Sequence, residues 1–136
     1  MRGTGYAFSA PSDWSVARSA REVSVSKGVG VVSVTRFRLQ HAFRPALWPK
    51  VVTESDRTAA AVAKQQAGSL VGSRTVTVAG RRARQYDIAY EQKGKKLVER
   101  LAFLLRAKTE YLLLCRYERG GDTRACGLLL ATFRLT

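Results

Sequence analysis

Apolar and polar residues alternate along most of the chain, which is the pattern of strands with one buried face. The alternation predicts extended segments at residues 6–8, 14–16, 22–26, 29–39, 71–78, 82–90, 97–106 and 110–117. The last four are joined by short segments containing glycine or charged residues. Such connections favour antiparallel pairing, because a parallel crossover needs a dozen or more residues. The strand at 82–90 is expected to bury Tyr86, Ile88 and Tyr90 on one face.

Two segments depart from the alternation. From Pro49 to Ala67 the chain is alanine-rich with apolar residues near helical spacing, and Gly68 follows as the expected end of the helix. Near the C-terminus, Asp122 is expected to cap a short helix over residues 122–132. Strands together with one long and one short helix predict an α+β fold, and the absence of a linker or repeat predicts one domain over residues 1–136.

The formal net charge of +14 favours acidic partners such as anionic surface polymers or nucleic acid. The basic residues are densest in two stretches, and a hairpin is expected to bring them onto one candidate binding rim of Arg81, Arg82, Arg84, Lys93, Lys95 and Lys96. Two alternatives stay open. For the rim, the alternative to binding is a charged edge that is simply solvated. For the net charge, the alternative is that the arginine excess reflects the codon usage of a G+C-rich genome.

Two cysteines are predicted to form a disulfide. Cys115 lies at the end of a predicted strand and Cys126 in the short helix that returns over it. A bridge closing a loop of this size stabilises a domain by about 3 kcal/mol in the chain-entropy model, and it would place the protein in an oxidising compartment. The alternative is two separate buried thiols in a cytosolic protein.

Residues that would support catalysis or metal binding are sparse. Structural zinc requires four thiolate or imidazole ligands, and the chain has two cysteines and one histidine. No glycine-rich phosphate loop follows a strand. His41 is expected to be an exposed loop residue, although a general base paired with an acid in a cleft is the alternative. We therefore expect no metal, no cofactor and no enzymatic activity.

No apolar run approaches the roughly 20 residues needed to cross a bilayer. The first five residues also lack the apolar stretch of a secretory signal. The chain is accordingly expected to be either a cytosolic protein or a mature region without its leader.

Motifs at both ends of the chain resemble a known family. Tyr6-Ala7-Phe8-Ser9-Ala10-Pro11 followed by Asp13-Trp14 resembles the Y-x-F-x-x-P-x-x-W opening of PsbP-like proteins. Residues 110–115, 125–126 and 132–135 resemble the closing portion of small actinobacterial envelope lipoproteins of that fold, and residues 79–83 resemble its Gly-and-Ala strand opening. A departure is that no lipid-attachment cysteine lies near Met1.

The resemblance implies an α/β/α sandwich with a central, mainly antiparallel sheet of about six or seven strands. It also implies a non-enzymatic role, since PsbP-like members act as accessory or binding proteins. The resulting hypothesis is an extracytoplasmic module, secreted or anchored through a leader, that recognises a protein or an acidic polymer of the bacterial envelope. The alternative from a different class is a basic cytosolic domain that binds nucleic acid.

Overall fold

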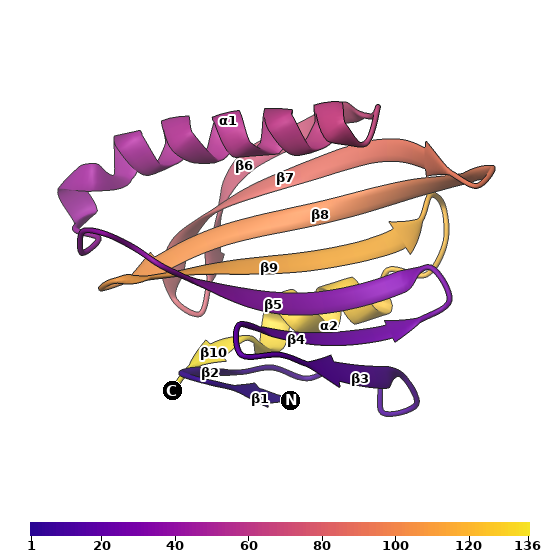
Figure 1. Cartoon of the computed structure of the whole chain (residues 1–136), viewed down its shortest axis with the longest axis horizontal. Helices are drawn as coiled ribbons and strands as arrows, with labels where there is room; N and C mark the ends of the chain where they lie inside the picture. The colour runs from indigo at the N-terminus through magenta and orange to yellow at the C-terminus, as the bar shows by residue number, and fades with distance from the viewer.

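Seven strands form one antiparallel sheet in the computed structural model, which describes residues 1–136. The strand order is β3-β4-β5-β9-β8-β7-β6 (Figure 1). Consecutive strands therefore pair as expected from the short turns, and β5 joins the two groups by pairing with β9. The strands are β3 (Ser15–Arg18), β4 (Glu22–Lys27), β5 (Gly30–Arg38), β6 (Ser69–Val78), β7 (Arg81–Gln92), β8 (Lys95–Arg106) and β9 (Thr109–Glu118).

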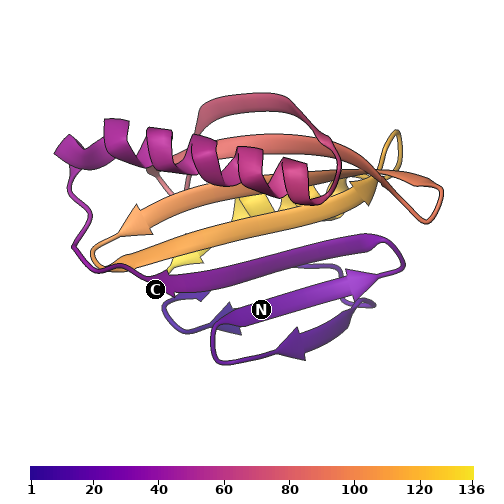
Figure 2. The same ribbon diagram turned by 45° about the horizontal axis from the view of Figure 1, so that its top comes forward.

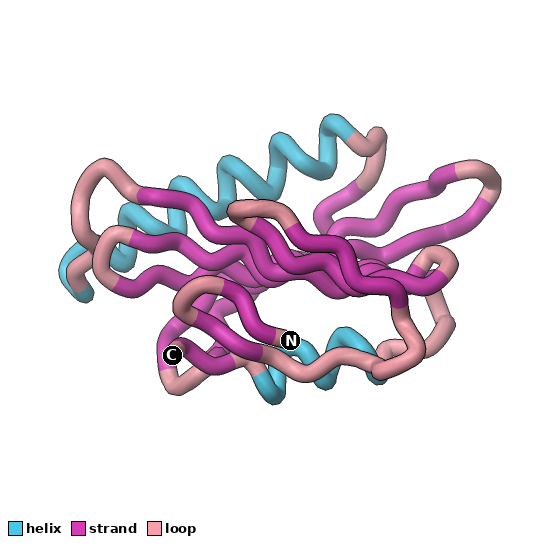
Figure 3. The backbone as a smooth tube through the Cα atoms, turned by 60° about the horizontal axis from the view of Figure 1, so that its bottom comes forward, coloured by secondary structure: helices cyan, strands magenta, loops and turns pink.

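Helices and a small second sheet cover the two faces of the large sheet. The 3-10 turn η1 (Pro45–Leu47) leads into α1 (Trp48–Gln65), which packs across β6 and β7 (Figure 2). On the other face lie α2 (Arg124–Thr132) and the short strands β1 (Arg2–Gly3), β2 (Tyr6–Ala7) and β10 (Arg134–Leu135) (Figure 3). This arrangement confirms the expected α+β sandwich.

The alternation in the sequence corresponds to two hydrophobic clusters, one on each face of the sheet. Tyr86, Ile88 and Tyr90 of β7 are buried on one face, as the sequence predicted, and they pack with Ala59 and Ala63 of α1. The larger cluster on the other face includes Tyr6, Phe8, Val34, Leu104, Leu113, Leu129 and Phe133. Because α1 presents mainly alanine to the sheet, its axis can lie close to the strands.

The predicted disulfide is present. Cys115 and Cys126 are bonded, with their Cα atoms 5.4 Å apart, and both are buried. The bridge joins β9 to α2 beneath the sheet, where both sulfurs belong to the larger cluster. It therefore ties the C-terminal helix directly to a central strand.

Both predicted helix boundaries differ from the structure in detail. At the end of α1, Ala67 adopts the left-handed conformation (φ 51°), and Gly68 is needed instead because Ala89 lies too close for a side chain. At α2, Thr123 rather than Asp122 is the N-cap residue, although the Asp122 carboxylate accepts the backbone N–H of Arg124 at 2.9 Å. The left-handed residue that ends α1 thus lies one position earlier than predicted, and the N-cap residue of α2 lies one position later.

Candidate functional site

A cleft of about 620 Å³ opens between the first half of α1 and the ends of β5 and β9. Its volume lies within the usual range of ligand sites. Its apolar walls come from Leu39, Phe43, Leu47, Val51 and Leu105. Its polar lining comes from Arg38, Gln40, His41, Lys50, Glu54, Ser55, Thr58 and Glu110. The surface thus combines apolar contact area with convergent polar groups.

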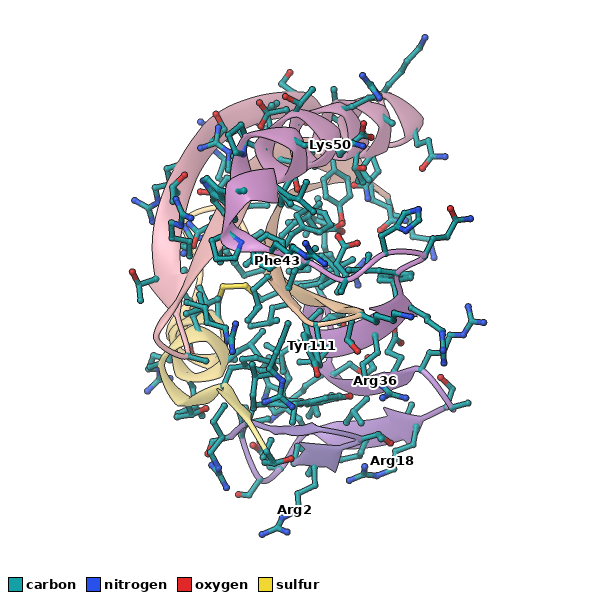
Figure 4. The ribbon with its side chains drawn as sticks, turned by 90° about the vertical axis from the view of Figure 1, so that its left-hand side faces the viewer. Arg2, Arg18, Arg36, Phe43, Lys50 and Tyr111 are labelled. Atoms are coloured by element: carbon teal, nitrogen blue, oxygen red, sulfur yellow. A yellow bond between two sulfur atoms is a disulfide. The ribbon has the colours of Figure 1, made fainter.

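The segment between β5 and α1 gives the cleft its shape. The backbone N–H groups of Leu39 and Phe43 donate to the carbonyls of Lys108 and Ala107, at 2.8 and 2.7 Å. These bonds hold the crossover against the β8–β9 turn. Figure 4 views this end of the molecule, with Lys50 of α1 above Phe43 of the crossover.

Two contacts fix α1 above the opposite half of the sheet. The guanidinium of Arg82 stacks over the Trp48 ring, 4.9 Å from its centroid. The Asp56 carboxylate accepts hydrogen bonds from the Tyr86 hydroxyl and from Nε of Arg84, the latter at 3.3 Å. Burial, followed by the hydrogen bond to Asp56, raises the pKa of Tyr86, so this phenol stays a donor. Both contacts lie in the N-terminal half of α1 and hold it over β7, while Val51 and Glu54 of the same half line the cleft.

Glu110 lines the cleft, and its carboxyl group is partly buried without a hydrogen-bond partner or an ion pair. It lies at the start of β9, opposite the half-exposed Phe37 of β5. Burial raises the pKa of the Glu110 carboxyl, and no hydrogen bond or facing charge offsets that effect. The carboxyl is therefore free to pair with a hydrogen-bond donor supplied by a ligand.

We predict that Glu110→Gln stabilises the protein near neutral pH. Because the folded pKa lies above the unfolded value of about 4.3, the folded chain binds more protons between the two values, and wild-type stability falls as pH rises through that interval. The variant should gain up to about 1 kcal/mol at pH 7 and less at pH 4. Urea unfolding at both pH values measures this, with the exposed Glu91→Gln as control. An equal gain at both pH values would contradict the assignment.

The structure does not bring the predicted basic rim together. Arg81 begins β7 and Lys95 begins β8 beyond the turn at the other end. A strand of 12 residues spans about 36 Å, so the arginines and the lysines lie at opposite ends of the sheet. Arg84 is also ion-paired to Asp56, with its side chain 16% exposed, and Arg82 covers Trp48. A binding role for Lys93, Lys95, Lys96 and Arg81 stays a prediction.

The cleft itself was not predicted from the sequence. Its residues come from positions 38–58 and 105–110, which no local pattern connects. His41 is exposed, as expected of a loop histidine, and it lines the same cleft as Glu54 and Glu110. No group of three or more His, Cys, Asp or Glu residues is placed to hold a metal ion. None of the helices is long and apolar enough to cross a membrane.

No protein-family model and no curated protein matches the chain. Solved structures share its fold. A Bacteroides thetaiotaomicron protein superposes with a TM-score of 0.63 at 12% identity, over 98% of this chain and 46% of that one. LpqN of Mycobacterium tuberculosis, described as involved in cell envelope biogenesis, superposes with a TM-score of 0.60 at 13% identity, over 96% of this chain and 83% of that one.

At these identities the likeness establishes a shared fold. The chain spans just under half the length of the Bacteroides structure. An envelope protein of the actinobacterial kind does occur among the structures of this fold, as the sequence motifs suggested. Membership of the PsbP-like family stays a prediction.

Proposed function

We propose that this protein is a non-catalytic binding module of the bacterial cell envelope that works outside the cytosol. Its cleft receives an apolar group of the partner, which is either a protein or an acidic polymer. The observation that carries the proposal is the cleft, with its apolar walls and its unpartnered Glu110 carboxyl. Ligand sites are typically concave, mainly apolar pockets with a few polar groups of this kind.

Exposed apolar side chains in the cleft and beside it support a binding role. Leu47 lines the cleft and is 39% exposed, and Phe37, the strand partner of Glu110, is 40% exposed. Lys50 and Arg38 line the same cleft. A partner that combines apolar and acidic groups would match both kinds of surface, and binding would remove the apolar side chains from water.

The compartment is supported by the disulfide and by the fold of LpqN. Disulfides persist in oxidising environments and are rare in the cytosol. The Cys115–Cys126 bridge joins two buried sulfurs of the core, so it is part of the folded structure rather than a surface feature. These observations favour the envelope hypothesis over a cytosolic domain that binds nucleic acid.

A fluorescent probe with an apolar body and one negative charge tests the cleft. Anilinonaphthalene sulfonate should bind, and Leu47→Asp should weaken binding at least about fivefold, which is the loss expected for one apolar contact and one repulsive charge. Val71→Asp introduces the same charge at an apolar side chain that is 61% exposed on β6, outside the cleft. This control should bind the probe within about twofold of wild type.

A competition experiment then tests whether the natural partner binds in the same cleft as the probe. A solubilised envelope fraction should displace the probe from wild type, whereas short DNA at about 0.2 M salt should not. Equal effects of the two aspartate variants would show that the probe does not use the cleft. Displacement by DNA alone would overturn the envelope proposal in favour of nucleic acid.

A further inference from the structure

We propose that a second site, the arginine notch, binds a phosphate group. The notch is lined by Arg2, Arg18, Arg21 and Arg36 and has a volume of about 180 Å³. It lies at the same end of the sheet as the cleft but is a separate cavity, and the inference does not depend on the proposed function. In Figure 4 Arg36, Arg18 and Arg2 follow one another below Tyr111.

Residues from four segments converge on the notch. Arg2 belongs to β1, Arg18 ends β3, Arg21 lies in the turn before β4, and Arg36 belongs to β5. Register brings them together, because Arg18 pairs with Val23 and the backbone N–H of Arg36 donates to the Arg21 carbonyl at 2.8 Å. The sheet edge and the small second sheet thus bring four arginine residues to the lining of one cavity.

The four arginines of the notch form no ion pair within the protein. The five ion pairs of the molecule involve other basic residues, namely Lys27, Arg57, Arg84, Arg100 and Arg124. Glu22 is the single acidic residue among the notch residues. Its carboxylate accepts a hydrogen bond from the Thr35 hydroxyl at 2.9 Å and forms no ion pair.

One of the guanidinium groups, that of Arg18, is held in place by a hydrogen bond. Nη1 of Arg18 donates to the Arg2 carbonyl at 2.6 Å, which secures the end of this side chain against β1. Burial raises the pKa of the Tyr6 phenol, and the nearby charges of Arg36 and Arg18 partly offset that rise. The Tyr6 hydroxyl donates to the Val34 carbonyl at 3.3 Å.

Like charges gathered around one cavity repel one another, and an anion bound between them removes that repulsion. Guanidinium groups bind phosphate with paired, charge-assisted hydrogen bonds, and a tetrahedral group presents oxygens in several directions. The notch has room for one such group with some water, since a water molecule takes about 30 Å³. An extended nucleic acid strand would require a longer groove with stacking aromatic side chains.

Calorimetric titration with inorganic phosphate at about 0.15 M NaCl tests the site, a salt level that screens diffuse attraction. Arg18→Gln with Arg36→Gln should weaken binding at least about tenfold, as expected when hydrogen bonds to a charged group are lost. Lys95→Gln with Arg119→Gln removes the same charge at exposed positions at the far end of the sheet. That pair should bind within about twofold of wild type.

A single substitution in the turn between β3 and β4 keeps the test valid even if the double variant fails to fold. Arg21→Gln is exposed and should weaken binding about threefold while the far-UV spectrum and the melting temperature stay unchanged. Equal weakening by both charge-matched pairs, or no heat of binding with phosphate, would overturn the site. Binding of short DNA that depends on Arg18 and Arg36 without any phosphate binding would overturn it in favour of nucleic acid.

Vesicles then distinguish the source of the phosphate. If phosphatidylglycerol vesicles compete with phosphate and phosphatidylcholine vesicles do not, the notch accepts an anionic lipid headgroup. If neither competes while phosphate binds through Arg18 and Arg36, the notch accepts a phosphate group of a soluble molecule. Both results support the site.

Discussion

Replacing Cys115 and Cys126 together by serine should lower the free energy of unfolding by about 3 kcal/mol. The bridge closes a loop with a sequence separation of 11, so its loss gives the unfolded chain more freedom. Both positions are buried, and their cluster loses the packing of two sulfur atoms as well. For a domain of this size the loss amounts to a fall of roughly 10 °C in melting temperature.

Urea unfolding of the wild type and the double variant, without reductant, measures this effect. The wild type should lose a similar amount of stability when dithiothreitol is added, while the variant should be insensitive to it. The Arg119→Gln variant, in the same connection between β9 and α2, serves as a control and should retain wild-type stability. A wild type indifferent to dithiothreitol would show that the bridge contributes nothing to folding.

Gly68→Ala should destabilise the protein by about 2 kcal/mol or more. A Cβ atom at this position would lie 2.5 Å from the Ala89 carbonyl oxygen and 2.8 Å from Cβ of Tyr90. Neither neighbour can turn away, because one is backbone and the other is attached directly to it. The C-terminal end of α1 or the adjoining part of β7 would have to shift.

The neighbouring Ala67→Gly supplies the matched opposite change. Ala67 has a φ of 51°, a conformation that glycine adopts at no steric cost, so this variant should gain about 0.5–1 kcal/mol. Thermal melts of both variants measure the pair. Two changes of the same sign would contradict the account of how α1 ends.

The architecture could be predicted because its signals are local. Period-two alternation defines β4 to β9, and the short turns define the pairing of β4 with β5 and the successive pairing of β6 to β9. The alanine-rich run between Trp48 and Gln65 defines the long helix. The pairing of β5 with β9 is not local, since it joins Val31 to Arg116. β1 and β10 contain two residues each, too few for any periodicity to show.

The candidate sites could not be predicted because they depend on where strands end. The rim of Arg81 and Lys95 was expected from a hairpin, but two strands of 12 residues place its ends far apart. The arginine notch combines Arg2, Arg18 and Arg36, which are scattered in the sequence and meet only through the register of β3, β4 and β5. A single arginine in a strand carries no sequence signal of such a meeting.

The redox state of the protein in its native cells tests the central claim, an envelope module outside the cytosol, most directly. Cells are alkylated before lysis, and the intact mass is compared with and without prior reduction. The account predicts no adduct before reduction and two after it, because Cys115 and Cys126 are bonded. Two adducts without reduction would place the protein in a reducing compartment and contradict the account.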